Sequence, residues 1–304
     1  MQALVVQRLS ADLSGIALVE LPAPTRAPGE VMVAVRAASL NFPDLLMTRG
    51  EYQFKPTVPF TCGLEFAGEV LEADPDSGFL PGDKVMGGNK TGAFAEIACV
   101  QADKLSPMPA GFDFAKAAAI GATYLTAYTG LVELGGLQQG QWVLVHGASG
   151  GVGLAACDLA RALGGRVIAT TGSAAKVETI AALARPEAVI TAEGRFREQI
   201  AEITAGALAD IVFDPVSGDV FDESTRCVAF GGKLIVVGFT SGRIANVAAN
   251  IPLIKGFSIV GLRAGEYARR FPERGIAINE AIRTLAEAHA IRPAIDRTLP
   301  LSRW

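Results

Sequence analysis

The stretch Val143-Leu144-Val145-His146-Gly147-Ala148-Ser149-Gly150-Gly151-Val152-Gly153 decides the fold of this chain. Its apolar beginning is typical of a buried strand, and residues 153–163, which follow, have the pattern of a helix. Between the two stands a cluster of glycines, where the chain has to turn sharply. The stretch therefore predicts a strand that runs through a glycine-rich turn into a helix.

The composition of this turn suits a pyrophosphate group. A pyrophosphate needs backbone N–H groups at close range, and side chains would block its approach. The start of a helix adds a favourable partial positive charge. A turn that needs glycine for positive φ explains one or two of the glycines but not the cluster. We therefore predict a dinucleotide site, whose expected contacts in the turn are Ala148, Gly150, Gly151, Val152 and Gly153.

The residues after the next predicted strand indicate which dinucleotide binds. Sites that prefer NAD usually place an acidic residue there, about 20 residues beyond the turn, to bind the ribose hydroxyls. Residues 169–176 of this chain contain no acid. Thr171 and Ser173 lie there instead, and Lys176 can place a positive charge against a 2′-phosphate. Lys176 could also be a solvated residue in the first turn of a helix. We predict that the cofactor is NADPH.

Strand and helix patterns alternate around the turn. Predicted strands cover residues 142–145, 166–170, 188–190, 210–213, 233–237 and 257–262. Predicted helices cover residues 153–163, 174–183, 196–204, 220–229 and 272–288. This rhythm implies right-handed crossovers and a doubly wound parallel sheet.

Residues 1 to about 110 have a different pattern. Short apolar runs at residues 3–6, 31–35 and 66–70 are separated by proline and glycine, which is typical of a small barrel or sandwich. Residues 112–134 have a helical composition. The predicted fold class is α/β, with a β-rich domain beside a doubly wound one.

Composition excludes several classes of protein. A chain of 304 residues suggests about two domains, and 50% hydrophobic residues are ample for a large core. The net charge of −4 gives no reason to expect a nucleic-acid partner. No apolar run is long enough to span a bilayer, and the start MQALVVQRLS does not resemble a signal peptide. We expect a cytoplasmic protein.

The cysteines and histidines predict no metal site. Cys62, Cys99, Cys157 and Cys227 are scattered without a CxxC pair, so we expect four reduced thiols that act as small hydrophobic residues. The two histidines lie far apart in the sequence, and no zinc-ligand spacing is present.

Several motifs in order resemble the zinc-free medium-chain dehydrogenase/reductase proteins, specifically the NADPH:quinone oxidoreductase and zeta-crystallin branch. They are Asn41-Phe42-Pro43-Asp44, the Gly63–Val70 segment GLEFAGEV, Pro81-Gly82-Asp83-Lys84-Val85, Gly92-Ala93-Phe94-Ala95-Glu96 and the glycine turn. The resemblance implies a GroES-like β-barrel catalytic domain (1–122), a Rossmann domain that binds NADPH (123–264) and a return to the catalytic domain (265–304), with the active site in the cleft between them.

The resemblance also implies a reaction without zinc. Zinc-dependent relatives carry a cysteine where Asn41 stands, a histidine where Leu64 stands and a four-cysteine lobe where this chain has only residues 86–91. Without a metal to polarise an alcohol oxygen, we expect hydride delivery to a quinone or an activated C=C bond rather than alcohol oxidation.

The family places particular residues around the nicotinamide. Asn41 and Asp44 would lie near the ring and the substrate, although both could be helix caps. Thr126 would pack beside the ring. Backbone groups of Val237, Gly238 and Phe239 would orient the carboxamide, and Leu262 and Arg263 would line the far side. Arg263 could bind an anionic group or lie on the surface.

Tyr52 leaves a choice of reaction open. It aligns with a tyrosine that enoyl-thioester reductases use near the double bond, where a phenol can donate the final proton. It could also be a half-buried residue that covers the mouth of the cleft. Our leading hypothesis is a quinone reductase in which proximity and orientation dominate catalysis. The alternatives are an enone or enoyl-thioester reductase and a non-catalytic, crystallin-like or sensor protein that binds NADPH.

Two expectations concern assembly and length. Family members commonly form homodimers through the edges of their Rossmann sheets, so residues 257–262 are the expected interface. Relatives usually continue beyond a segment like residues 299–304 with a helix and a final strand. We therefore expect this chain to be shorter than they are at its C-terminus, as in a truncated or variant form.

Overall fold

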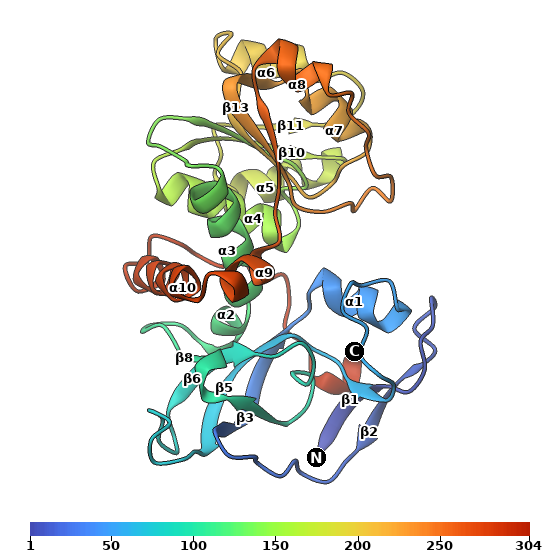
Figure 1. Ribbon diagram of the computed structural model, residues 1–304, viewed down its shortest axis with the longest axis vertical. Helices are drawn as coiled ribbons and strands as arrows, with labels where there is room; N and C mark the ends of the chain where they lie inside the picture. Colours follow the sequence, from blue (N-terminus) through green and yellow to red (C-terminus); the bar gives the residue numbers. More distant parts are fainter. The chain divides into compact units, whose positions relative to one another are not determined.

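The computed structural model describes all residues from Met1 to Trp304 and divides the chain into two compact units. Unit 1 comprises Met1–Ala122 and Ile295–Trp304, and unit 2 comprises Thr123–Ala294. Figure 1 shows the path of the chain through both. The boundary between them falls within the first turn of helix α3 (Gly121–Tyr128).

Unit 1 contains two antiparallel sheets. Its strands are β1 (Gln2–Val6), β2 (Ile16–Glu20), β3 (Glu30–Ser39), β4 (Phe60–Thr61), β5 (Glu65–Glu72), β6 (Lys84–Gly88), β7 (Ile97–Gln101) and β8 (Leu105–Pro107). The strand orders are β2-β1-β4 and β7-β3-β5-β6-β8. An isolated bridge joins Ala3 of β1 to Ala95, two residues before β7. Its helical segments are α1 (Phe42–Arg49), η1 (Ala102–Lys104), α2 (Phe114–Ala118) and η4 (Leu301–Arg303).

The two largest apolar clusters of unit 1 pack on β3 and on β1. Val31 and Val33, which alternate along β3, pack against Phe66 of β5 in the larger cluster. A smaller cluster gathers Leu4, Val6, Met47, Phe60 and Cys62, and Leu301 packs against it. Leu301 is partly buried by this contact, which helps to explain why residues 295–304 return to unit 1 although they follow unit 2 in the sequence.

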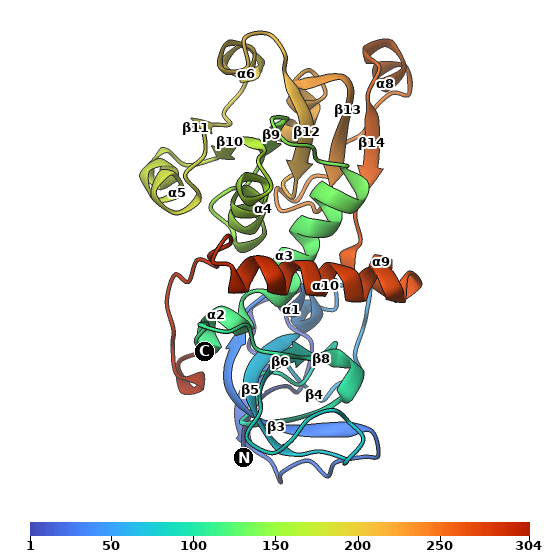
Figure 2. The same ribbon diagram turned by 90° about the vertical axis from the view of Figure 1, so that its left-hand side faces the viewer.

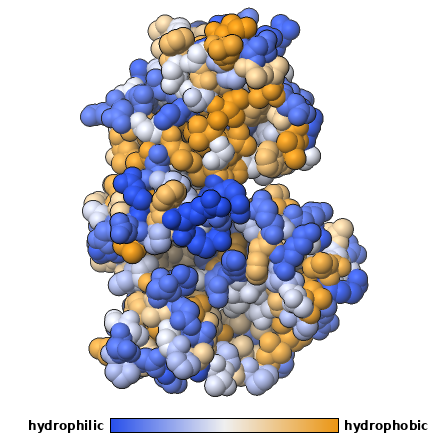
Figure 3. Space-filling model, in the orientation of Figure 1, coloured by the Kyte–Doolittle hydropathy of each residue, from blue (hydrophilic) through white to orange (hydrophobic).

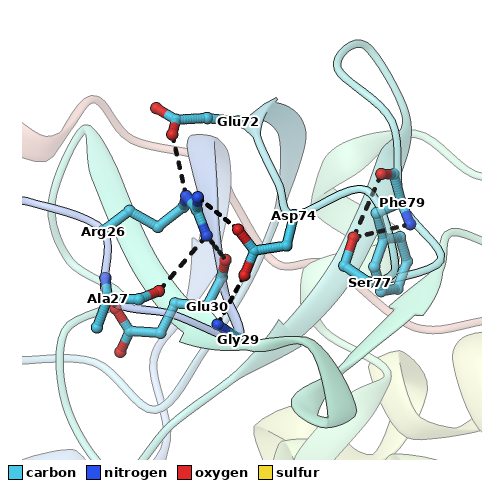
Figure 4. A network of polar contacts seen from close by, with 8 residues as sticks. All are labelled: Arg26, Ala27, Gly29, Glu30, Glu72, Asp74, Ser77 and Phe79. Atoms are coloured by element: carbon cyan, nitrogen blue, oxygen red, sulfur yellow. Dashed lines mark hydrogen bonds and ion pairs between the residues drawn. The ribbon is translucent and has the colours of Figure 1, made fainter.

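A charged network braces the far end of the β3–β5 pair (Figure 4). The Arg26 guanidinium contacts Glu72 at 3.1 Å and Asp74 at 2.6 Å, and Asp74 also accepts the Gly29 N–H. Arg26 donates further to the carbonyl of Glu30 at 3.0 Å. The network therefore ties the loop before β3 to the loop after β5.

Unit 2 is built on one parallel six-stranded sheet. The strands are β9 (Trp142–Val145), β10 (Arg166–Thr171), β11 (Ala188–Thr191), β12 (Ala209–Asp214), β13 (Val228–Val236) and β14 (Ser258–Gly261). Their order, visible from left to right in Figure 2, is β11-β10-β9-β12-β13-β14. The predicted doubly wound sheet is confirmed.

Helices cover both faces of this sheet. Its helical segments are η2, a π-helix (Thr129–Leu134), α4 (Gly151–Ala162), η3 (Ala174–Lys176), α5 (Val177–Ala184), α6 (Arg197–Ile203), α7 (Asp219–Ser224), α8 (Asn250–Lys255), α9 (Ala264–Arg270) and α10 (Pro272–Glu287). Helices α4 and α5 contact β9, β10 and β11. On the other face, Leu144 packs with Phe196, the residue before α6, and with Ile200 of α6 and Phe221 of α7.

Two predictions differ from the structure. The helix predicted at 220–229 ends at Ser224, because Val228 already pairs with Ala209 in the sheet. Residues 265–294, predicted to return to the first domain, lie in unit 2. There the Tyr267 hydroxyl donates to Glu133 at 2.8 Å, and Arg274 forms an ion pair with the same carboxylate at 2.5 Å. These contacts hold α9 and α10 to the π-helix.

No helix of the chain combines the length and the apolar character that crossing a membrane requires. The four cysteines are free thiols.

Candidate functional site

The glycine turn of unit 2 has the predicted local geometry. The chain leaves β9, adopts φ 57° at Gly147 and enters α4 with Gly150 as its N-cap. A Cβ on Gly153 would lie 2.3 Å from the Gly147 carbonyl oxygen, so only glycine allows the helix to start this close to the strand end.

The turn fits a pyrophosphate. A Cβ on Gly150 would have its nearest neighbour at 3.5 Å and one on Gly151 at 3.4 Å, so neither glycine is required by close packing of the protein itself. Both stand at the start of α4. The Gly150 N–H already donates to the Gly147 carbonyl at 3.0 Å, whereas the N–H groups of the first helical residues, beginning with Gly151, have no intrahelical acceptor. Anions bind well at such a helix start. Ala148 plays a different part, because its N–H donates to the Thr170 carbonyl at 2.9 Å and its side chain is buried.

Buried polar side chains brace the turn from behind. His146 contacts Thr170 Oγ1 through Nδ1 at 2.8 Å and Ser224 Oγ through Nε2 at 2.7 Å. The Ser224 hydroxyl donates to the Val220 carbonyl, so it accepts from Nε2–H, and Nδ1 accepts from Thr170. Complete burial lowers the pKa of His146 to about 3. His146 is therefore a neutral structural residue.

Asp214 holds the loop that faces the turn. Its Oδ1 accepts the N–H groups of Val216 and Ser217 at 2.8 and 2.9 Å, while its Oδ2 has no partner. Burial raises the pKa of this carboxyl group. A Cβ on Gly147 would lie 3.2 Å from the Val216 side chain, so this loop forms the neighbouring wall of the turn.

The end of β10 carries the residues predicted to read the 2′-phosphate. The Ser173 N–H donates to Thr171 Oγ1 at 3.2 Å, and Ser173 is the N-cap of η3. Thr171 is buried, whereas Lys176, the last residue of η3, is exposed and forms no ion pair. Ser173 and Lys176 lie within one short helical turn, so both can meet one anionic group.

Helix α3 also lies beside the glycine turn. Thr123 Cγ2 is the atom 3.4 Å from the Gly151 Cβ position. One residue further on, the Tyr124 hydroxyl donates to Asp158 of α4 at 2.7 Å. Thr126 follows on the same helix and is half-buried.

The remaining predicted site residues of unit 2 lie in the segments after β13 and β14. The Val237 N–H donates to the Asp214 carbonyl at 2.9 Å, and Phe239 is 45% exposed. Leu262 is buried, and its N–H donates to the Val236 carbonyl. Arg263 is the N-cap of α9, and its exposed guanidinium lies 3.8 Å from Glu266. Arg263 is thus already paired, weakly, with a carboxylate.

The remaining predicted residues, Asn41, Asp44 and Tyr52, lie in unit 1. Ser39, Asn41, Asp44, Glu65 and the Ala122 N–H form what we call the polar cluster. Asn41 is the N-cap of α1, and its N–H donates to Asp44 at 2.8 Å in a capping box. Its side-chain Nδ2 donates to Glu65 at 2.8 Å, and the other Glu65 oxygen accepts the Ala122 N–H at 2.7 Å. Asn41 and Asp44 are therefore helix caps, and the structure joins them to Glu65.

Both carboxyl groups of the polar cluster are buried. Asp44 is 3% exposed and Glu65 is 7% exposed. Burial, with a contribution from the nearby Glu65 charge, raises the pKa of Asp44 to about 7. Burial also raises the pKa of Glu65, while hydrogen bonds from Ser39, Asn41 and Ala122 oppose this change. Only Asp44 has an oxygen, Oδ1, without a partner.

Tyr52 is half-buried in unit 1. It packs against the cluster that contains Leu4 and Met47, and its hydroxyl makes no hydrogen bond to the protein. Sequence reasoning did not single out Glu65 or Asp214. The available signal was an acid beside an apolar run, in GLEFAGEV and in ADIVFDPV, because such acids are rarely buried unless they are paired.

Comparison with known proteins agrees with this geometry. A doubly wound sheet with a glycine turn, preceded by a β-rich unit, defines a two-domain oxidoreductase that uses a dinucleotide. Residues 27–110 match the family model of the alcohol dehydrogenase GroES-like domain, and residues 151–280 match that of the zinc-binding dehydrogenases.

Individual relatives indicate the branch of this family that the chain resembles. Quinone oxidoreductase-like protein 2 from Bos taurus is 35% identical over 283 residues, covering 92% of this chain and 80% of the bovine protein. A probable oxidoreductase from Mycobacterium abscessus has a TM-score of 0.89 at 34% identity, covering 99% of this chain and 92% of that one. Escherichia coli quinone oxidoreductase complexed with NADPH has a TM-score of 0.86 at 27% identity, covering 97% and 90%.

The chain belongs to the medium-chain dehydrogenase/reductase superfamily, in its quinone oxidoreductase-like branch. Unit 1 is its GroES-like domain, unit 2 is its Rossmann domain, and the predicted fold class is confirmed.

Proposed function

We propose that this chain is an NADPH-dependent reductase that transfers hydride to a quinone without zinc. The glycine turn carries the proposal, since Gly150 and Gly151 leave room for a phosphate at the start of α4. The E. coli quinone oxidoreductase complexed with NADPH has the same fold. When bound, NADPH supplies a hydride; the quinone takes up this hydride and one proton from water to become the hydroquinone.

The preference for NADPH over NADH rests on the end of β10. Residues 169–176 contain no acid that could bind the ribose hydroxyls. The exposed Lys176 and the neighbouring Ser173 offer a cation and a hydroxyl to a 2′-phosphate instead. Thr171 supports them by fixing the Ser173 backbone.

For the nicotinamide end we adopt the residues that the family resemblance implies. In unit 2 they are Thr126, Val237, Gly238, Phe239, Leu262 and Arg263. The Val237 and Gly238 N–H groups already bond to the Asp214 carbonyl, at 2.9 and 3.4 Å, so the Phe239 N–H and the Val237 carbonyl are the groups suited to a carboxamide. The family resemblance also assigns Asn41 and Asp44 to the nicotinamide ring and the acceptor.

Independence from zinc rests on the chemistry of the residues. Asn41 and Leu64 stand where zinc-dependent relatives carry a cysteine and a histidine. The Asn41 Nδ2 donates to Glu65 at 2.8 Å, and an amide nitrogen is not a zinc ligand. The Leu64 side chain has no atom that could bind zinc. No group of three or more histidine, cysteine, aspartate or glutamate side chains is arranged to hold a metal ion.

Reduction of an activated C=C bond is the second candidate activity. Tyr52 favours it, because its hydroxyl makes no bond to the protein and a phenol can donate the proton that completes the reaction. NADPH oxidation should be measured with a 1,4-benzoquinone and with a 2-alkenal, for the wild type and for Tyr52→Phe. Quinone turnover that survives Tyr52→Phe supports our proposal. Alkenal turnover lost in that variant supports the second activity. Tight NADPH binding without oxidation by either acceptor overturns both and favours a non-catalytic protein.

We also propose that the chain forms a homodimer through the edge of the unit 2 sheet. Strand β14 is an outer strand of that sheet. Beside it, Phe230, Leu253 and Ile254 are 89%, 80% and 73% exposed, and Figure 3 shows apolar surface at the top of the view, over α8. A second copy would cover both the open edge and these side chains.

The test of the dimer is its mass in solution. Light scattering should give twice the chain mass for the wild type and a single chain mass for Leu253→Glu with Ile254→Glu. The matched control is Ile276→Glu on α10, which replaces an isoleucine that is 71% exposed in the same unit. A monomeric wild type overturns this proposal.

A further inference from the structure

The Glu65 carboxylate is the buried group that the proposed function leaves without a role. It lies on β5 and is 7% exposed. One of its oxygens accepts the Ser39 hydroxyl and the Asn41 Nδ2, the latter at 2.8 Å. The other accepts the Ala122 N–H at 2.7 Å. A single side chain thus joins β3, the start of α1 and the start of α3.

All three partners of Glu65 are able to donate, and two of them, the amide nitrogens, can only donate. An ionised carboxylate is a pure acceptor and satisfies them together. No lysine, arginine or histidine forms an ion pair with Glu65, and the titratable group that faces it is Asp44 on α1. The positive end of α3 therefore stabilises the charge together with these hydrogen bonds.

Gly121 shows that the sequence makes room for this arrangement. A Cβ on Gly121 would lie 2.4 Å from the Glu65 Oε2 atom. Alanine is ordinarily the better helix former by about 1 kcal/mol. Glycine at the first residue of α3 therefore lets the carboxylate reach the helix N-terminus.

The contact with Asn41 fixes the direction of its amide. Because Glu65 only accepts, the nitrogen of the Asn41 amide has to face it, and the oxygen has to face the opposite way. The Asn41 backbone N–H is fixed separately by Asp44 at 2.8 Å. Asn41 itself is half-buried, so it retains access to solvent.

We propose that Glu65 is a positioning residue, whose ionised carboxylate fixes the orientation of the Asn41 amide and the start of α3 for hydride transfer. This inference rests on the proposed role of Asn41 beside the acceptor. Glu65 does not touch the ligand. It acts through Asn41, so its removal should lower kcat while the affinity for NADPH changes little.

The test is Glu65→Gln, which preserves the size of the side chain. A glutamine has to present its NH₂ group either to the Ala122 N–H or to Ser39 and Asn41, so at least one hydrogen bond is lost or the Asn41 amide flips. We expect kcat with a 1,4-benzoquinone to fall by about 10- to 100-fold. The KM for NADPH should change by less than about 3-fold.

A pH profile separates positioning from a merely structural effect. The raised pKa of Glu65 means that it protonates at a higher pH than an ordinary glutamate. The kcat of the wild type should therefore fall on the acid side, and Glu65→Gln should lack this fall. Because Asp44 faces Glu65 and also titrates, Asp44→Asn is measured in parallel and should retain the fall.

Control variants make each outcome interpretable. Glu69→Gln changes a glutamate on the same strand that pairs with Arg36 outside the polar cluster, and should leave kcat unchanged. Gly121→Ala places a Cβ against the Glu65 Oε2 atom and so displaces the carboxylate from the start of α3. This variant should lower kcat as Glu65→Gln does. If Glu65→Gln does not fold, the kcat of Gly121→Ala decides.

Asn41→Ala distinguishes the failure of this inference from the failure of the proposed function. If Asn41→Ala leaves kcat unchanged, the proposed role of Asn41 is wrong, and the inference about Glu65 falls with it. If Asn41→Ala lowers kcat but Glu65→Gln and Gly121→Ala do not, only the positioning role is overturned. The positioning role would also be overturned if Glu69→Gln lost as much kcat and as much melting temperature as Glu65→Gln.

Discussion

The glycine turn of unit 2 and the polar cluster of unit 1 are built in opposite ways. The turn consists of residues 147–153, which are consecutive in the sequence, and presents backbone N–H groups. The polar cluster joins Ser39, Asn41 and Glu65 to Ala122, which lies 57 residues beyond Glu65, and it works through side chains. A site made of local backbone is fixed by a short motif, whereas a site made of distant side chains depends on the whole fold of its unit.

Electrostatics differs between the two regions as well. The turn is backed by His146, which burial holds in its neutral form. The polar cluster contains two carboxyl groups whose pKa values burial raises. Stability should therefore respond to pH in opposite directions in the two regions, and this contrast can be measured.

The largest expected effect tests whether the turn depends on backbone geometry alone. Gly153→Ala places a Cβ 2.3 Å from the Gly147 carbonyl oxygen, so the helix start has to move away from the strand end. We expect the Kd for NADPH, measured by fluorescence titration, to rise by about 1,000-fold, equivalent to about 4 kcal/mol.

Gly265→Ala is the matched control for this variant. It lies in α9, where a Cβ would meet no atom within 4 Å, and it should bind NADPH as the wild type does. Unchanged NADPH binding by Gly153→Ala would show that the close approach of helix and strand is not required.

The second prediction concerns Asp44 in the polar cluster. Its pKa is raised from 3.8 to about 7, so between these values the folded state holds a proton that the unfolded state has released. Stability is therefore lost as the pH rises through this range. Relative to the wild type, Asp44→Asn should gain about 3.7 kcal/mol of unfolding free energy between pH 4 and pH 8.

Urea unfolding at both pH values measures this gain. The difference between the two pH values is informative, because the absolute stability of Asp44→Asn also includes the cost of burying an amide. A gain that does not change with pH would contradict the raised pKa.

The third prediction concerns His146 and has the opposite sign. Its pKa is about 3 in the folded state, against an ordinary histidine value of 6.5, so below pH 6.5 the unfolded state binds a proton that the folded state does not. Its contribution to stability is complete above pH 6.5 and falls as the pH is lowered. At pH 4.5 the loss should be about 2.7 kcal/mol.

His146→Gln should lack this part of the acid destabilisation, although it is less stable than the wild type at neutral pH, because it cannot bond to both Thr170 and Ser224 as the ring does. The slope of unfolding free energy against pH, from urea titrations between pH 4.5 and pH 7.5, is the measurement. Equal slopes for the two proteins would show that His146 takes up a proton in the folded state.

The smallest effect concerns the one charged side chain that we assign to the 2′-phosphate. Lys176→Ala should raise the KM for NADPH by about 10-fold, or about 1.4 kcal/mol, and leave the KM for NADH unchanged. Lys104→Ala, another exposed lysine, is the control and should change neither constant. Equal KM values for NADPH in the wild type and Lys176→Ala would remove the basis for the preference.

The sequence predicted unit 2 well for a physical reason. Each strand is a short apolar run and each helix has its own periodicity, so predicted strands such as 142–145 and 166–170 agree with β9 and β10. Errors occurred where long-range contacts decide. Val228 left the predicted helix to pair with Ala209, and residues 265–294 joined unit 2 because Tyr267 and Arg274 bind Glu133.

By itself, the sequence determined the glycine turn, since Gly147, Gly150, Gly151 and Gly153 act through local backbone conformation and a lack of side chains. Only the tertiary structure decided that Asn41 caps α1 and bonds to Glu65, and that Glu65 reaches the Ala122 N–H. These contacts join residues that are far apart in the sequence, and a hydrogen bond depends on the distance and direction between its two groups, which no local motif encodes.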